Sequence, residues 1–234
     1  MERVTPPLAL PHLSELSDDE LAQAYAPLGE PWLRVNFVST VDGAAQGDDG
    51  LSKSINNPVD KRVFDALRRQ ADCLVVGAGT LRDEGYDVPR LPLVVVSRSG
   101  EVPDNLRGAP EGRILMATTS SADGLAEARS LLGDEQVLVL GDDAVDLVEL
   151  KSRLAQRGWV DQLSEGGPGL FAALLEAGVV DELCLTIVPR LLGGDFTRIT
   201  AGADLDVSLR PHSLLEEDGT LLGRWLVTSG PSEG

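Results

Sequence analysis

Four short runs of continuous apolar residues recur in the middle of the chain. Each is four residues long without polar alternation, which is typical of a strand buried on both faces of a sheet. The runs are Cys73–Val76, Leu93–Val96, Ile114–Ala117 and Val137–Leu140. Segments with helical patterns alternate with them, including 123–132, 144–157 and 169–177. This alternation predicts an α/β fold around a mainly parallel central sheet.

The remaining strands are expected at the two ends of this pattern. One strand is predicted over 32–41 and another over 181–188. A hairpin is predicted from strands near 207–215 and 221–228, because Asp218-Gly219 between them favours a tight turn. We therefore expect an antiparallel C-terminal hairpin at one edge of the sheet.

Two helices carry clear start signals. Ser17 is a candidate N-cap with Glu20 three residues later, the pattern of a capping box. Asn57 is a second N-cap, and Pro58 follows at the first helical position. The segment from Val59 to Ala71 then places its apolar residues on one helical face.

Composition limits the class of protein. The 234 residues are 42% hydrophobic, enough for one domain spanning 1–234, in which the Pro-rich residues 1–12 are expected to form an extended arm. A formal net charge of -18 argues against binding nucleic acid or an anionic membrane. The start of the chain lacks a signal-peptide pattern and no apolar run is long enough to span a membrane, which favours the cytoplasm. Cys73 and Cys184 are expected to be buried free thiols, and no metal site is predicted.

The segment Glu165-Gly166-Gly167-Pro168 joins a predicted strand to a predicted helix. Glycine lets the backbone turn sharply and approach a ligand closely, and proline suits the first helical position. The free N–H groups of a helix N-terminus bind anions, so the segment suggests a site for a nucleotide diphosphate. The alternative interpretation is an ordinary tight turn between a strand and a helix.

Two further strand ends strengthen the first interpretation. Thr40-Val41-Asp42-Gly43 and Gly77-Ala78-Gly79-Thr80 also follow predicted parallel strands. Ligands of open α/β sheets bind at the carboxyl ends of the strands, where these three segments would meet. The Gly-x-Gly-x-x-Gly pattern of dinucleotide-binding folds is absent from the first strand–helix turn, which disfavours that fold.

The chain resembles the reductase domain of bacterial riboflavin biosynthesis, a family with a dihydrofolate-reductase-like fold. The resemblance rests on Asn36–Gly43, Leu67-Arg68, Val76–Thr80, Glu165–Pro168, Val180–Leu183 and Pro189–Gly194, in the order of the family. It implies a three-layer α/β sandwich and a single reductase domain. It also implies homodimers, for which the region from Val180 to Gly194 is a plausible contact.

The resemblance implies NADPH as hydride donor and a pyrimidine with a ribosyl or ribityl phosphate as acceptor. An arginine such as Arg98 suits the 2′-phosphate of NADPH, although a solvated arginine in a turn is an equally good interpretation. Glu165 is expected either to orient the glycine turn through backbone N–H groups or to touch the cofactor, and the first role is favoured because a carboxylate beside a diphosphate would be repelled. The expected cofactor residues are Thr40, Gly77, Gly79, Thr80, Ser97, Arg98, Glu165, Gly166, Gly167, Pro168, Gly169 and Leu170.

On the substrate side, the resemblance makes Asp42 the candidate catalytic residue, either hydrogen-bonding the pyrimidine or helping to deliver a proton. An Asp-Gly turn needed only for the backbone is the alternative. The expected substrate-binding residues are Asn36, Asn56, Lys61, Arg62 and Tyr86. Lys61 and Arg62 are the candidate phosphate ligands, or else part of a solvated helix face.

Departures from the family pattern concentrate on the substrate side. Ala44 stands where the family commonly has lysine, and segments 52–57 and 83–90 differ from the family's Ser-x-Trp-Ile-Thr-Gly and Asp-x-Pro-x-Leu-x-x-Arg. The zinc-binding motifs of the deaminase half are also absent from this sequence. Two alternatives therefore stay open: reduction of another heterocycle, such as dihydrofolate or a dihydropterin, and a non-catalytic NADPH-binding protein.

Overall fold

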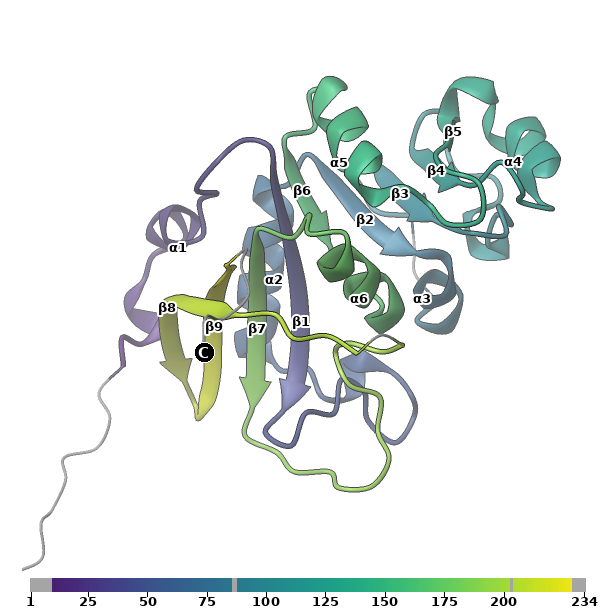
Figure 1. Ribbon diagram of the computed structural model, residues 1–234. Helices are drawn as coiled ribbons and strands as arrows, with labels where there is room; N and C mark the ends of the chain where they lie inside the picture. The colour runs from purple at the N-terminus through teal and green to yellow at the C-terminus, as the bar shows by residue number, and fades with distance from the viewer. Residues whose placement is uncertain (1–9, 86–87, 203, 229–234) are drawn as a thin grey trace, which may run out of the picture.

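The computed structural model describes residues 10–85, 88–202 and 204–228. Within them, nine strands form one sheet in the order β5-β4-β3-β2-β6-β1-β7-β9-β8 (Figure 1). The strands are β1 (Trp32–Thr40), β2 (Cys73–Gly77), β3 (Leu93–Val96), β4 (Ile114–Thr118), β5 (Val137–Val139), β6 (Asp161–Ser164), β7 (Glu182–Val188), β8 (Leu209–Glu217) and β9 (Thr220–Val227).

The strand directions confirm the expected architecture. From β5 to β7 all neighbouring strands pair in parallel, whereas β9 is antiparallel to both β7 and β8. Asp218 and Gly219 join β8 to β9 with φ values of 50° and 76°. Positive φ at both turn residues matches the twist of the two strands, so the predicted hairpin forms at the predicted dipeptide.

Helices cover both faces of the sheet and complete three layers (Figure 1). They are α1 (Asp18–Ala24), α2 (Pro58–Gln70), α3 (Ala78–Asp83), α4 (Leu125–Leu132), α5 (Leu147–Gln156) and α6 (Pro168–Glu176). Residues of β2 alternate between the two cores: Leu74 and Val76 pack in the cluster with α1 to α4, and Cys73 and Val75 in the cluster with α5 and α6. The continuous apolar run thus reflects burial on both faces, as predicted.

The predicted helix starts are also present. Ser17 and Glu20 form a complete capping box at α1, and the side chain of Asn57 accepts a hydrogen bond from the N–H of Asp60 at α2. The glycine segment after β2 begins α3, with Gly77 as its N-cap. Of the expected N-terminal arm, residues 1–9 lie outside the described residues, and His12 forms an isolated bridge with Glu216.

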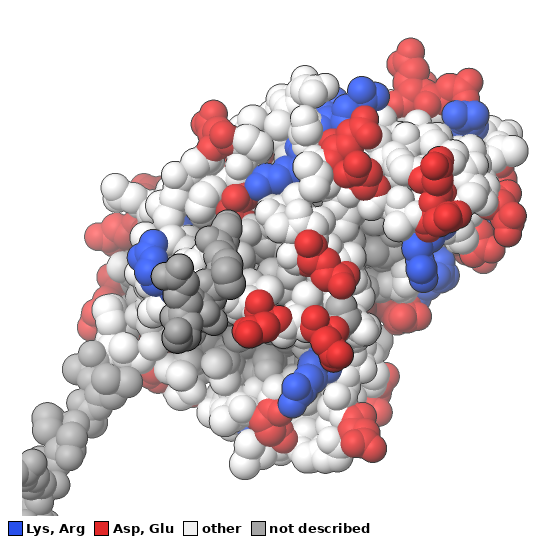
Figure 2. All heavy atoms as spheres, viewed as in Figure 1, with Lys and Arg blue, Asp and Glu red and all other residues white. Residues whose placement is uncertain are grey.

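The acidic composition appears on the surface. Figure 2 shows carboxylates spread across the visible face, with Lys and Arg side chains between them. Cys73 and Cys184 are buried free thiols, as expected. Across the described ranges, no helix combines the length and the apolar character needed to cross a bilayer.

Candidate functional site

Two hollows lie at the carboxyl ends of the parallel strands. The first, here the β1 cavity, has a volume of about 300 Å³ and is lined by residues of β1, the 45–56 loop, α2, α3 and the segment after β6. The second, here the β3 groove, has a volume of about 1040 Å³ and runs past α3, the loop after β3, and α6. Both lie where open α/β sheets bind ligands.

The wall between the two hollows consists of the two glycine segments identified in the sequence. Thr80, Gly167 and Pro168 line the β1 cavity, whereas Gly77 and Gly169 line the β3 groove. The N–H of Gly77 donates a hydrogen bond of 2.9 Å to the carbonyl oxygen of Gly166. A ligand in the groove and a ligand in the cavity would therefore meet across this wall.

Close packing explains the two glycines after Glu165. Gly166 has a φ of +84°, and a Cβ there would lie 2.7 Å from Cζ of Phe37. A Cβ on Gly167 would lie 2.3 Å from Oγ1 of Thr80. The peptide bond between the two glycines is cis. Glycine is thus required at Gly166 by both its positive φ and its close approach to Phe37, and at Gly167 by its close approach to Thr80.

The β3 groove contains six of the expected cofactor residues: Gly77, Gly79, Ser97, Arg98, Gly169 and Leu170. A cation not singled out in the sequence, Arg82, lines it as well, together with the carboxylates of Asp143 and Glu176. The N-terminus of α6 at Gly167 has no side-chain cap, so its backbone N–H groups are available to a ligand. Two guanidinium groups and a helix N-terminus fit the phosphates of a dinucleotide.

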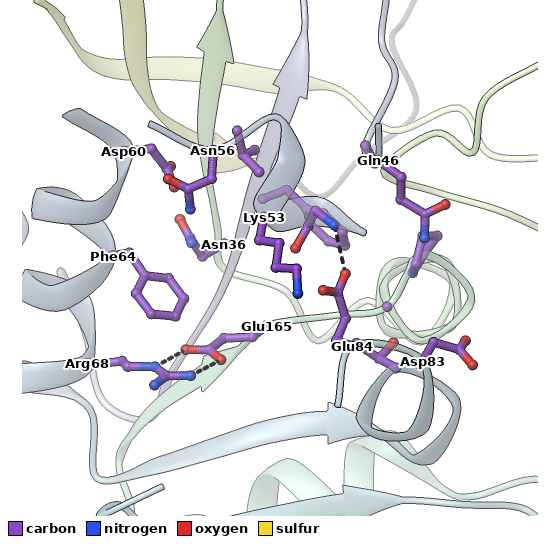
Figure 3. Close-up of a pocket in the computed structure, with 17 residues that line it drawn as sticks. Asn36, Gln46, Lys53, Asn56, Asp60, Phe64, Arg68, Asp83, Glu84 and Glu165 are labelled. Atoms are coloured by element: carbon purple, nitrogen blue, oxygen red, sulfur yellow. Dashed lines mark hydrogen bonds and ion pairs between the residues drawn. The ribbon is translucent and has the colours of Figure 1, made fainter. Parts of the chain in front are cut away.

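Glu165 differs from its expected role. Its two carboxylate oxygens accept hydrogen bonds of 2.6 and 2.7 Å from Nε and Nη2 of Arg68 (Figure 3). The Arg68 guanidinium also lies 4.3 Å from the centre of the Phe64 ring. Burial raises the pKa of the Glu165 carboxyl group, against the opposing effect of Arg68. Glu165 therefore fixes α2 against the segment after β6, and does not cap the glycine turn through its side chain.

Asp60 is a cavity residue that the sequence reasoning missed. It is only 2% exposed, yet it borders the β1 cavity. Burial raises the pKa of its carboxyl group to about 6, against hydrogen bonds from Thr186 and Asn56 that favour the charged form. One signal was available: Asp60 stands four residues before Phe64 on the apolar face of α2, where a carboxylate is unexpected.

The expected substrate residues Asn36 and Asn56 both line the β1 cavity. Figure 3 shows them on the same side of the cavity as Asp60, whereas Asp83 and Glu84 lie on the opposite side. Glu84 accepts a hydrogen bond of 2.9 Å from the N–H of Ser52 and so links α3 to the 45–56 loop. The ionisable side chains that line the cavity are Lys53, Asp60, Arg68, Asp83, Glu84 and Glu165.

Asp42 is not among the residues that line the β1 cavity or the β3 groove. Its carboxylate accepts hydrogen bonds from the hydroxyl of Thr40 and from the N–H groups of Leu192 and Gly193, at 3.0 and 2.7 Å. The bond from Thr40, followed by that from Gly193, lowers the pKa of Asp42. Thr40, expected to contact the cofactor, instead holds the loop, because its Oγ1 also accepts from the N–H of Ala44. This geometry gives both residues a role in loop structure.

Lys61 and Arg62 also point elsewhere. Lys61 pairs with Asp65 one turn further along α2, at 2.8 Å. Arg62 donates hydrogen bonds to the carbonyl oxygens of Leu13 and Leu16, which fixes the N-terminal segment to α2. Tyr86, the last expected substrate residue, lies outside the described residues. Among the described side chains, no group of His, Cys, Asp and Glu is arranged to hold a metal ion.

Two curated proteins are similar to this chain in sequence. The sequence is 30% identical over 190 residues to a 2,5-diamino-6-ribosylamino-4(3H)-pyrimidinone 5′-phosphate reductase of Methanothermobacter thermautotrophicus, covering 75% of this chain and 86% of that protein. It is 29% identical over 190 residues to the riboflavin biosynthesis protein RibD of Mycobacterium tuberculosis, covering 77% of this chain but only 48% of that protein.

The fold is shared with solved structures. A pyrimidine reductase-like protein of Corynebacterium diphtheriae superimposes with a TM-score of 0.74 at 22% identity, covering 92% of this chain and all of that one. The family described as the RibD C-terminal domain matches residues 31–220, which include every strand of the sheet from β1 to β8. This chain therefore belongs to the RibD C-terminal domain family.

Proposed function

We propose that this protein is a cytoplasmic, NADPH-dependent reductase of a riboflavin-pathway pyrimidine of the 5-amino-6-(5-phosphoribosylamino)uracil type. The observation that carries the proposal is the shared wall of Gly77–Thr80 and Gly167–Leu170. A donor in the groove and an acceptor in the smaller cavity would lie next to each other across this wall, which supports the proposal. Family membership supports a reductase.

The residues of the β3 groove are suited to hold NADPH, which supplies the hydride when bound. Gly77, Gly79 and Gly169 allow its backbone to approach closely, and Arg82 and Arg98 are placed to balance phosphate charge. In the acceptor, carbon C1′ of the ribosyl group gains a hydrogen as its bond to the ring oxygen breaks. That oxygen takes up a proton, so that a ribosylamino group becomes a ribitylamino group.

The proton source is assigned to the β1 cavity. Asp60 is a buried carboxyl group of this cavity, and burial raises its pKa to about 6, within reach of neutral pH. Asp42, the earlier candidate, is held by the loop as a hydrogen-bonded anion. Asp60 or a water molecule that it binds is therefore the better proton donor in this proposal.

Purified protein tests the proposal directly. NADPH oxidation is followed with 5-amino-6-(5-phosphoribosylamino)uracil and with its 2-amino precursor, and the ribityl product is identified by mass spectrometry. NADH replaces NADPH in a parallel assay. We expect turnover of at least one of the two pyrimidines with NADPH, and the proposal fails if NADPH binds and neither pyrimidine is reduced.

A second candidate function is reduction of another heterocycle, such as a dihydropterin or dihydrofolate. The charge of the β1 cavity supports this second candidate. Four carboxylates and two cations line the cavity, and one of the cations, Arg68, is paired with Glu165. That balance is poorly suited to a phosphate group inside the cavity. Fast dihydrofolate turnover without pyrimidine turnover would select this candidate. NADPH binding without reduction of any of these acceptors would instead select a non-catalytic binding protein.

The oligomeric state belongs to the proposal as well. We propose a homodimer that uses the region from Val180 to Gly194, in which Leu191 is 74% exposed. Sedimentation of the wild type and of Leu191→Glu tests this, and a wild-type monomer would contradict it.

A further inference from the structure

Four charged side chains line the β3 groove: Arg82, Arg98, Asp143 and Glu176. The described part of the chain offers none of these four side chains a hydrogen-bond or ion-pair partner. Their charges are therefore available to a ligand. The two cations suit the phosphates of a dinucleotide, but the two carboxylates do not, so their presence in this groove needs a separate explanation.

Asp143 lies at the end of the groove that is far from the β1 cavity. It follows β5, and Arg98 follows β3, and both strands stand on the side of β2 away from β1 (Figure 1). Neighbouring strands are about 4.8 Å apart, so β5 lies about 14 Å from β2. A cofactor with its nicotinamide at the wall formed by Gly77 and Gly167 would thus place its adenosine half near Arg98 and Asp143.

The turn between β5 and α5 fixes the backbone on both sides of Asp143. The carboxylate of Asp142 accepts a hydrogen bond of 2.6 Å from the hydroxyl of Ser120. The carboxylate of Asp146 caps α5 by accepting a hydrogen bond of 2.8 Å from the N–H of Glu149. Two of the three carboxylates of this turn thus stabilise local structure, whereas that of Asp143 lines the groove.

The two nicotinamide cofactors differ only at the 2′ position of the adenosine ribose. A guanidinium group binds the 2′-phosphate of NADPH in a charge-assisted, bidentate manner. A carboxylate repels that phosphate and accepts a hydrogen bond from the 2′-hydroxyl group of NADH. Arg98 and Asp143, at the same end of one groove, therefore favour opposite cofactors.

Resting on the proposed function, we propose that Asp143 is a specificity-determining residue that weakens the selectivity for NADPH and allows the groove to bind NADH as well. Arg98 sets the preference for NADPH. Asp143 limits that preference, because its carboxylate repels the 2′-phosphate and accepts a hydrogen bond from the 2′-hydroxyl group. The protein can then take its hydride from either cofactor.

Asp143→Asn tests this role, because the amide keeps the shape of the side chain and removes its charge. Calorimetric titration with adenosine 2′,5′-bisphosphate and with 5′-AMP compares the two kinds of ribose without an acceptor or turnover. We expect Asp143→Asn to bind the bisphosphate about 3- to 10-fold more tightly than the wild type, the effect of one exposed charge several ångströms from a phosphate. It should bind 5′-AMP no more tightly than the wild type does.

Two further measurements separate charge from structure. Raising the salt concentration from about 0.05 M to about 0.5 M should reduce the gain for the bisphosphate, because salt screens repulsion between exposed charges. In assays with a pyrimidine acceptor, the ratio of kcat/KM for NADPH to kcat/KM for NADH should rise in Asp143→Asn by the same factor as the ratio of the two affinities.

Asp142→Asn is the matched control. It makes the same chemical change one residue earlier in the same turn, at a side chain that bonds to Ser120 and does not line the groove. The amide oxygen can still accept that hydrogen bond, so both Kd values should equal those of the wild type. Equal changes in the two variants would attribute the effect to the turn and overturn the role of the Asp143 charge.

The failures of the two proposals have different patterns. An unchanged ratio of the two Kd values in Asp143→Asn, a gain that salt does not reduce, or a wild type that binds NADPH and not NADH would each overturn the role of Asp143 and leave the reductase intact. If the nucleotides bind as expected and neither pyrimidine is reduced, the proposed function fails while the role of Asp143 in nucleotide selection stands.

Discussion

Arg68 and Glu165 are joined by two hydrogen bonds, Nε to Oε1 and Nη2 to Oε2, at 2.6 and 2.7 Å. The Glu165 side chain is 4% exposed and the Arg68 side chain 29%. This pair fixes α2 to the segment after β6, directly beside the glycines that separate the cavity from the groove.

Arg68→Met should leave the buried Glu165 carboxylate without its guanidinium partner. Removing one partner of a buried ion pair is strongly destabilising, so we expect the free energy of unfolding to fall by about 3 kcal/mol. Urea unfolding measures this change. The double variant Arg68→Met/Glu165→Leu should lose less, because both charges are gone. Arg69→Met is the control, since Arg69 is exposed on the same helix. A loss no larger than that of the control would contradict the role of the pair.

The Arg68–Glu165 pair also shows what the sequence could not predict. Strands and helix starts were predictable because their signals are local: the apolar run at 73–76 and the caps Ser17 and Asn57 each act within a few residues. Glu165 and Arg68 are separated by 97 positions. Their contact depends on how α2 packs against the sheet, so sequence reasoning gave Glu165 a local role in its own turn.

Gly167→Ala tests the close approach at the wall. Gly167 has φ -83°, which any residue adopts, so the cost comes from the clash of the new Cβ with Oγ1 of Thr80. Overpacking of this kind costs about 1 to 3 kcal/mol. In a Thr80→Ala background the hydroxyl is absent and the nearest remaining atom, Thr80 Cβ, is 3.6 Å away. We therefore expect most of the penalty to disappear in the double variant.

Chemical unfolding of the single and double variants gives the coupling energy. Gly169→Ala is the matched control, because a Cβ there meets nothing within 4 Å and alanine favours a helix. It should be neutral or slightly stabilising. If Gly167→Ala lowers the free energy of unfolding by the same amount in the wild-type and the Thr80→Ala backgrounds, the clash with the Thr80 hydroxyl is not the cause.

Arg98→Gln tests the selectivity for the phosphorylated cofactor. Arg98 lines the β3 groove beside Ser97 and Ser99. If its guanidinium binds the 2′-phosphate, its loss should raise the KM for NADPH about tenfold and change the KM for NADH little. Arg153→Gln on α5, outside both hollows, should change neither. An unchanged preference for NADPH in Arg98→Gln would leave Arg82 as the remaining arginine of the groove.

The expected substrate residues show a second limit of sequence reasoning, because only some of them lie at the cavity. Asn36 and Asn56 were expected at the substrate and do line the cavity. The consecutive residues Asp60, Lys61 and Arg62 point in three different directions. Asp60 lines the cavity. Lys61 pairs with Asp65, and Arg62 donates a hydrogen bond to the carbonyl oxygen of Leu13. Consecutive helical residues face directions about 100° apart, so a motif match does not decide which one reaches the ligand.

The raised pKa of Asp60 should make the stability of the folded chain depend on pH. Its carboxyl pKa is about 6 in the folded chain and 3.8 in the reference state. Between these values the folded state keeps a proton that the unfolded state has lost, so stability is highest at low pH and falls as pH rises toward 6. A difference of this size corresponds to about 3 kcal/mol. The groups that face Asp60 are Asn36, Asn56 and Thr186, which are neutral, with Lys53, Arg68 and Glu165 further along the cavity wall.

Urea unfolding between pH 4 and pH 7 should therefore show Asp60→Asn gaining stability relative to the wild type as the pH rises, since the amide does not ionise. Glu165 titrates in both proteins, so the difference isolates Asp60. A constant difference in unfolding free energy across this range would mean that Asp60 keeps an ordinary pKa in the folded chain.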